Sequence, residues 1–166
     1  PLIRGGKHEN GLRVGTHNVA GIVGFGKAAD LVRRRMAQEA CDTACLRDAL
    51  MDGIFERVDG VLVNGSLTWR LPNNLSVTID EVESGELIRA LDARGVCVSS
   101  GSACTSGQSE PSHVLTAMGV EPHRAHGALR MTLGKDNTRE EIAYVVEALA
   151  ETVDALRGRK PAAATA

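Results

Sequence analysis

The sequence predicts a small α/β sandwich, with three or four strands and helices packed on one face of the sheet. Short apolar or alternating runs recur along the chain, which is typical of strands. Between them lie longer stretches with apolar residues three and four positions apart, which predict amphipathic helices. Because both kinds of segment alternate within 166 residues, we expect one mixed fold around a single core.

The predicted elements follow from hydrophobic pattern and capping residues. Asn18 is a good N-cap, so we expect a helix over residues 19–58. The run 74–79 alternates polar and apolar residues, which indicates a strand with one buried face. Thr138 and Glu141 form a capping box, and a helix with an apolar stripe follows them. The other strands are expected at 61–63, 96–98 and 128–133, and the other helices at 84–95 and 111–119.

Composition and charge exclude several classes of protein. The formal net charge is −2, and aromatic residues make up 2% of the chain. A nucleic-acid-binding protein would carry a basic patch, and base stacking would need clustered aromatic side chains. No apolar run is long enough to cross a membrane, and no secretory signal opens the chain. We therefore expect a cytoplasmic protein with no nucleic-acid and no membrane partner.

Four cysteines, Cys41, Cys45, Cys97 and Cys104, are too few for a disulfide framework, so a reducing compartment is expected. Cys41 and Cys45 would share one helix face, either as half of a metal site or in plain packing. Because no second pair of ligands stands at a suitable spacing, we expect packing and predict no metal. Cys97 lies within a predicted strand and is expected to be buried and inert.

Cys104 differs from the other cysteines because it lies among small residues, in the run Ser99-Ser100-Gly101-Ser102-Ala103-Cys104-Thr105-Ser106-Gly107. A structural cysteine usually has apolar neighbours, whereas this loop would present its sulfur to solvent or to a substrate. An accessible and mobile thiol is what a cysteine nucleophile requires. The residues alone leave open the alternative of a surface loop with an incidental cysteine.

Five separate stretches resemble segments of the cysteine desulfurases, which are pyridoxal phosphate (PLP) enzymes with the class V aminotransferase fold. One is the Cys104 loop with the sequence that follows it, as far as Leu115. The other four are Gly5–Asn18, Gly21–Gly26, Arg70–Val77 and Ala128–Gly134. The resemblance covers nearly the whole chain, and several motifs in order are more specific than a lone glycine pattern. Three residues depart from the glycine, glutamine and arginine expected in the first segment: Lys7, His8 and Asn10.

The resemblance implies the small C-terminal domain of a fold-type I PLP enzyme, with a three- to four-stranded sheet and helices packed on it. In that family a lysine of the large domain holds PLP as a Schiff base. It is expected upstream, because none of Lys7, Lys27, Lys135 and Lys160 has the family's sequence context. We expect residues 1–17 to end the large domain, 18–158 to form the small domain and 159–166 to be a flexible tail.

The resemblance also implies three site residues. Cys104 would be the catalytic nucleophile and the carrier of a persulfide. Arg130 would hold the substrate carboxylate, which a planar guanidinium binds through two parallel hydrogen bonds; the alternative is an exposed strand arginine. Thr16 would bind the PLP phosphate of a neighbouring subunit, which implies a homodimer; the alternative is a turn hydroxyl bonded to local backbone. His113 is expected to be structural.

The predicted function is the C-terminal part of a cysteine desulfurase. Such an enzyme takes sulfur from L-cysteine, releases L-alanine and passes the persulfide sulfur on Cys104 to an acceptor scaffold, for iron–sulfur cluster assembly or another delivery route. Without the PLP lysine, the chain alone is expected to be inactive. Two alternatives stay open, a non-catalytic sulfur-carrier or interaction domain and a selenocysteine lyase. Arg130 argues against a pure carrier, because a carrier needs no carboxylate clamp.

Overall fold

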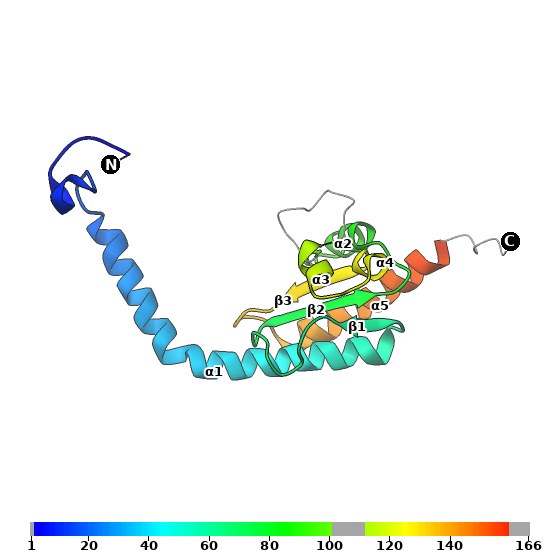
Figure 1. The fold of residues 1–166 in the computed structure, drawn as a ribbon. Helices are drawn as coiled ribbons and strands as arrows, with labels where there is room; N and C mark the ends of the chain where they lie inside the picture. The colour runs from blue at the N-terminus through cyan, green and yellow to red at the C-terminus, as the bar shows by residue number, and fades with distance from the viewer. Residues whose placement is uncertain (1, 101–111, 160–166) are drawn as a thin grey trace. The chain divides into compact units, whose positions relative to one another are not determined.

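The computed structural model describes residues 2–100 and 112–159, and the chain divides into two compact units, Pro1–Gln38 and Glu39–Ala166. The second unit is built on a three-stranded antiparallel sheet in the order β1-β2-β3 (Figure 1). Its strands are β1 (Val61–Val63), β2 (Asn74–Ile79) and β3 (Ala128–Thr132). The helices are η1 (His8–Gly11), α1 (Val19–Arg57), α2 (Ser84–Asp92), α3 (His113–Ala117), α4 (Pro122–Ala125) and α5 (Arg139–Arg159).

The main core lies between one face of the sheet and the longer helices. Alternate residues of β2, Leu75, Val77 and Ile79, are at most 1% exposed and face this core, as their spacing predicts. The apolar stripes of the helices meet them there and include Leu50, Ile54, Leu87, Leu91, Leu149 and Val153. The small α/β fold expected from the sequence is thus confirmed.

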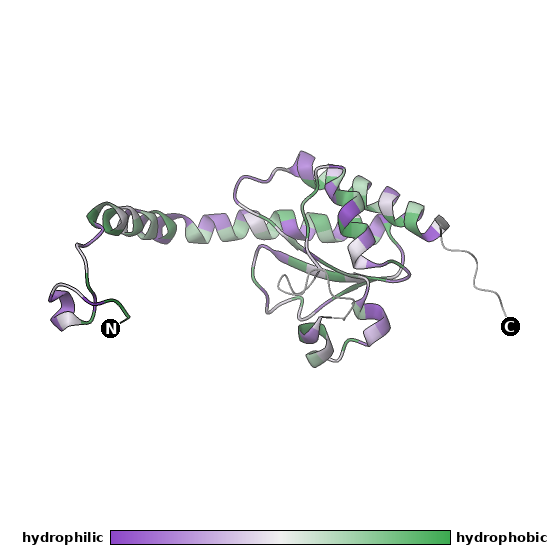
Figure 2. Cartoon of the chain, turned by 90° about the horizontal axis from the view of Figure 1, so that it is seen from above, coloured by the Kyte–Doolittle hydropathy of each residue, from purple (hydrophilic) through white to green (hydrophobic). Residues whose placement is uncertain are grey.

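The opposite face of the sheet carries a second, smaller cluster. Ala128 of β3 packs there with Leu115 of α3 and Ala125 of α4. Figure 2 shows these two short helices across the sheet from the longer ones. The expectation of helices on one face was therefore incomplete, because the sheet has two faces to cover and α3 and α4 pack on the second.

The predicted strand at 96–98 is wrong. Backbone pairing in this segment is limited to Ser99, which exchanges two hydrogen bonds with Arg130 of β3 in an isolated antiparallel bridge. The N–H of Val96 instead bonds the carbonyl of Leu91, because Gly95, at a φ of 77°, folds the chain back onto the end of α2. A run of β-branched residues predicts strand propensity, but pairing requires a partner in reach.

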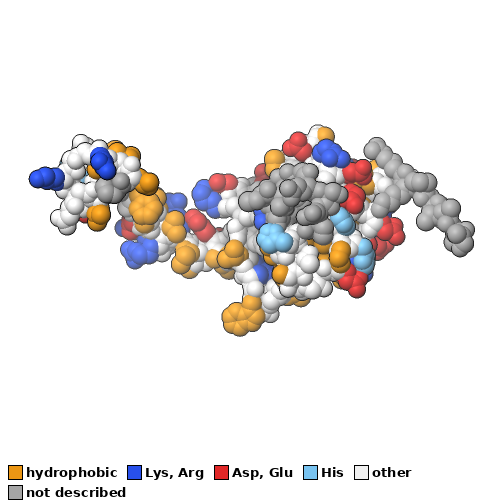
Figure 3. Space-filling model, turned by 45° about the horizontal axis from the view of Figure 1, so that its top comes forward, with side chains coloured by type: hydrophobic (Ala, Val, Ile, Leu, Met, Phe, Trp, Pro, Cys, Tyr) orange, Lys and Arg blue, Asp and Glu red, His pale blue; other side chains and the backbone are white. Residues whose placement is uncertain are grey.

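The first unit contains the N-terminal segment and the first part of α1. The Asn18 cap is confirmed, since its side-chain oxygen accepts a 3.0 Å bond from the N–H of Gly21. Large apolar side chains are exposed along this part of α1, and Figure 3 shows orange side chains along it. They include Val19, Ile22, Val23, Phe25, Val32 and Met36. Over residues 2–100 and 112–159, no helix is both long and apolar enough to cross a membrane.

The capping box before α5 forms as predicted. The Thr138 hydroxyl accepts a bond from the N–H of Glu141, and the Glu141 carboxylate accepts one from the N–H of Thr138. Hydrogen bonds from the side-chain amide of Asn137 and from the N–H of Thr138 stabilise the carboxylate and so lower the pKa of Glu141. A carboxyl whose pKa is lowered by folding stabilises the protein above its unfolded pKa. That contribution is lost as the pH falls through its folded pKa.

We expect Thr138→Ala to lower the free energy of unfolding by about 1 kcal/mol at neutral pH, because one N-cap hydrogen bond is lost. The measurement is the urea midpoint of the chain, compared with Thr138→Ser, which keeps the hydroxyl. Equal midpoints for the alanine and serine variants would show that the hydroxyl bond of the box contributes nothing to stability.

Candidate functional site

A pocket of about 360 Å³ opens on the face of the sheet that carries Arg130. Its walls are residues 64–74 (called the 64–74 loop below, although Asn74 already begins β2), Ser76 of β2, Arg130 of β3, and side chains of α3 and its flanks. The pocket lies wholly within the second unit. Arg130, which the resemblance implies as the carboxylate-binding residue, is half-buried and lines this pocket, and its binding role stays a prediction.

Strand register places four polar residues in one row across the sheet. Ser76 pairs with Arg130, and Arg130 pairs with Ser99. On the other side of Ser76 lies Asn64, whose N–H bonds the Ser76 carbonyl at 2.8 Å and whose side-chain amide bonds the Ser76 hydroxyl at 3.1 Å. Residues opposite one another in a sheet project from the same face. Arg130 is therefore flanked by neutral hydrogen-bonding groups.

Arg130 also lies where the chain enters and leaves the segment 101–111. On the entering side, Ser99 is held to Arg130 by backbone bonds of 2.6 and 3.0 Å. On the leaving side, Ser112 is buried and lines the pocket together with Arg130. Cys104, the predicted nucleophile, lies within 101–111, outside the described residues. Of the residues that flank the Cys104 segment, Ser99 is thus paired with Arg130, and Ser112 lines the pocket that Arg130 also lines.

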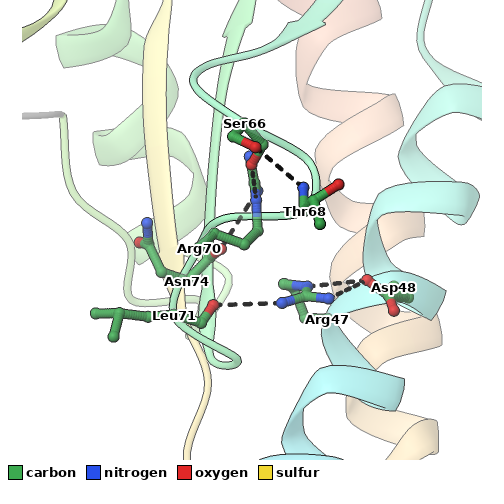
Figure 4. A network of polar contacts seen from close by, with 7 residues as sticks. All are labelled: Arg47, Asp48, Ser66, Thr68, Arg70, Leu71 and Asn74. Carbon is green, nitrogen blue, oxygen red and sulfur yellow. Dashed lines mark hydrogen bonds and ion pairs between the residues drawn. The ribbon is translucent and has the colours of Figure 1, made fainter.

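The pocket is positively charged, since its described lining includes two arginines, Arg70 and Arg130, and no acidic side chain. Figure 4 shows how Arg70 lies in the loop between β1 and β2. Its guanidinium donates to the backbone carbonyls of Ser66 at 2.7 Å, Asn64 at 3.1 Å and Asn74 at 3.4 Å. Burial, followed by the nearby charge of Arg47, lowers the pKa of Arg70.

Thr16, the predicted phosphate contact, lies in the first unit and is exposed. Its carbonyl accepts a 3.2 Å bond from the guanidinium of Arg13, which also bonds the carbonyl of Gly15 at 2.5 Å. Arg13 thereby holds the turn that presents Thr16, and its role could not be assigned from the sequence. The binding role of Thr16 stays a prediction.

The described residues of the pocket fit a substrate carboxylate and lack an amine that could hold PLP as an imine. Lys135 is bonded to Asp136, and Lys27 lies 4.0 Å from Asp30. Neither of these, nor the exposed Lys7, lines the pocket. The location of the PLP lysine stays a prediction.

Two expectations about the other cysteines are wrong. Cys97 is exposed, because the unpaired segment buries Val96 and turns the next side chain outward. Cys41 and Cys45 are exposed on α1 and so do not pack in the core of this chain. No cluster of three or more metal-ligating side chains occurs among the residues that the structure describes.

Sequence reasoning missed Arg70, Asn64 and Ser76 as parts of the site. Arg70 stands in the stretch that resembles the family, which was interpreted only as a strand. Its relation to Arg130 depends on closure of the 64–74 loop and on the strand register, and neither can be read from spacing along the chain.

Residues 6–145 match the family described as Aminotransferase class-V, and the chain belongs to this family. Its relatives within it are cysteine desulfurases, which confirms the resemblance. A cysteine desulfurase IscS from an Anaeromyxobacter species is 48% identical over 157 residues, or 95% of this chain and 38% of the relative. An IscS from Methanosarcina thermophila is 43% identical over 161 residues, or 97% of this chain and 40% of the relative.

Solved structures agree in fold. A protein titled NifS-like protein superposes with a TM-score of 0.76 at 35% identity, over 93% of this chain and 39% of that one. A NifS-like protein from Rickettsia africae gives the same TM-score at 30% identity. The chain therefore spans about two fifths of the length of these relatives and has their small mixed fold.

Proposed function

We propose that this chain is the C-terminal part of a PLP-dependent cysteine desulfurase that forms a persulfide on Cys104. The observation that carries the proposal is the convergence at Arg130. Ser99, before segment 101–111, pairs with Arg130 through two backbone hydrogen bonds, and Ser112, after that segment, lines the pocket that holds this arginine. A nucleophile carried on that segment has its two anchors beside a group suited to hold the carboxylate of an amino acid.

In this proposal Arg130 binds the substrate carboxylate, and the neutral side chains of Asn64 and Ser76 flank it. PLP, held on a lysine elsewhere in the polypeptide, would supply an electron sink for the carbon skeleton. The Cys104 thiolate attacks the sulfur of L-cysteine, so that a sulfur–sulfur bond forms and the carbon–sulfur bond breaks. The bonding electron pair stays on carbon, which takes up a proton and leaves as the methyl group of L-alanine.

The thiol must be ionised to attack, and an unperturbed cysteine has a pKa of about 8.5. A thiol that reached a site whose described lining carries two guanidinium groups and no carboxylate would be favoured as the thiolate.

The proposal includes three further parts. Thr16, presented by the turn that Arg13 holds, would bind the PLP phosphate in the other subunit of a homodimer. The persulfide sulfur would pass to an acceptor scaffold, with iron–sulfur cluster assembly as the first candidate destination. The location would be the cytoplasm, where free thiols stay reduced.

The test is an assay of the complete polypeptide with L-cysteine and PLP, which should yield alanine and protein-bound persulfide in equal amounts. The 166-residue chain alone, given PLP, should release no alanine above a Cys104→Ala control. Alanine release by the chain alone would contradict the proposal that the PLP lysine lies elsewhere in the polypeptide. A complete polypeptide that forms no persulfide would overturn the proposed function.

Removal of the Arg130 side chain should weaken substrate binding in the complete polypeptide. We expect Arg130→Met to raise KM for L-cysteine about a hundredfold, because two charge-assisted hydrogen bonds are lost. Arg130→Lys keeps the charge without the planar fork and should raise KM about tenfold. Steady-state kinetics measure both, and an Arg130→Met variant with an unchanged KM would show that this arginine does not hold the carboxylate.

A further inference from the structure

Arg70 is held in the pocket by backbone carbonyls rather than by a carboxylate. Three carbonyls of the 64–74 loop accept its hydrogen bonds, those of Asn64, Ser66 and Asn74. The Ser66 hydroxyl accepts further bonds from the N–H groups of Thr68 and Trp69, which close the same loop. Carbonyl dipoles satisfy the N–H groups of a guanidinium but leave its full positive charge in place.

The nearest charged residues beyond the pocket do not neutralise Arg70. Arg47 on α1 is bonded to Asp48 at 2.6 and 2.9 Å, so these two charges are paired with each other (Figure 4). The pKa of Arg70 is lowered by its burial and then by Arg47, and Asp48 offsets only part of this. Because an arginine stays protonated at neutral pH, the 64–74 loop brings an uncompensated cation to the pocket that Arg130 also lines.

We infer that Arg70 is a second, positioning residue of the carboxylate site. Its charge adds to the attraction that Arg130 exerts on an anion, and its three hydrogen bonds fix the wall on which Asn64 stands. The inference rests on the proposed function only in the choice of a carboxylate as ligand. It requires that loss of Arg70 weakens carboxylate binding while Arg130 is still present.

The chain offers a matched control in Arg157 of α5. This half-buried arginine also donates to backbone carbonyls across the fold, those of Asp59 and Asp80, at distances of 2.8 to 3.3 Å. It does not line the Arg130 pocket. Arg157→Met therefore removes a comparable set of structural hydrogen bonds without removing charge from the site.

Ser76 and Arg130 are half-buried and line the pocket, so their backbone N–H resonances report binding without any enzymatic reaction. The experiment titrates the ¹⁵N-labelled 166-residue chain with sodium propionate at constant ionic strength, and with the neutral propionamide as the matched ligand. We expect a saturable shift with propionate alone. Arg70→Met should weaken propionate binding about tenfold, since a half-buried charge lining the same pocket as the anion contributes on that scale.

Arg70→Lys, which keeps the charge, should bind propionate within about threefold of the unchanged chain, and Arg157→Met should bind it equally well. Equal binding by Arg70→Met and the unchanged chain would overturn the inference, as would equal weakening by Arg157→Met or no propionate binding at all. None of these outcomes depends on desulfurase activity. Failure of the activity assay on the complete polypeptide would overturn the proposed function and leave this binding result unaffected.

Discussion

Cys104→Ala in the complete polypeptide is expected to abolish persulfide formation while the absorbance of bound PLP survives. The thiolate is the only group of this chain proposed to form a bond with the substrate sulfur, and no neighbouring hydroxyl has comparable nucleophilicity at neutral pH. Loss of a covalent nucleophile typically lowers the rate by at least about a thousandfold. Protein-bound persulfide, measured by alkylation and mass, should fall below detection.

Cys97→Ala is the matched control for this variant. Cys97 is exposed and lies on the same approach to the pocket, before the bridge of Ser99 to Arg130. If exposure alone made a cysteine the sulfur carrier, Cys97 would serve as well as Cys104. If sulfur transfer from L-cysteine persisted in Cys104→Ala and was lost in Cys97→Ala, Cys97 would be the nucleophile. That result would contradict the proposed mechanism.

The sequence predicted the elements whose local signals agree with their tertiary setting. Residues 74–79 alternate because one face of β2 meets the main core, and Thr138 and Glu141 satisfy the start of α5 within four residues of chain. Local and long-range requirements coincide there, so spacing along the chain was sufficient to find the strand and the cap.

The sequence was insufficient where pairing across the fold decides the outcome. Residues 96–98 have the β-branched composition of a strand, yet the turn at Gly95 leaves only Ser99 in position to pair with β3. The same dependence hid the positive pocket. Arg70 and Arg130 are far apart in sequence and line one pocket because the sheet aligns Asn64, Ser76 and Arg130 in one row. The resemblance identified Arg130 by its motif, whereas the residues that surround Arg130 could be found only from the strand register.

Gly127→Ala is expected to destabilise the second unit by at least about 3 kcal/mol, because the new methyl group would collide with backbone. An added Cβ would overlap the carbonyl oxygen of Ile79 and lie 3.2 Å from that of Val82. Neither atom can rotate away as a side chain could. The carbonyl of Gly127 accepts a 3.0 Å bond from the N–H of Ile79, so relief of the clash would separate β2 from the start of β3.

The effect should appear as a lower urea midpoint of unfolding for the chain. Gly158→Ala is the control, because a Cβ at that helical position of α5 meets nothing within 4 Å and should leave stability unchanged or slightly raised. Gly127 immediately precedes β3 and lies three residues before Arg130. If the Gly127→Ala chain is only partly folded, it should therefore also lose propionate binding at the pocket. A Gly127→Ala chain as stable as Gly158→Ala would mean that β3 can shift away from Ile79 at little cost, and that the row through Arg130 is less rigid than its register implies.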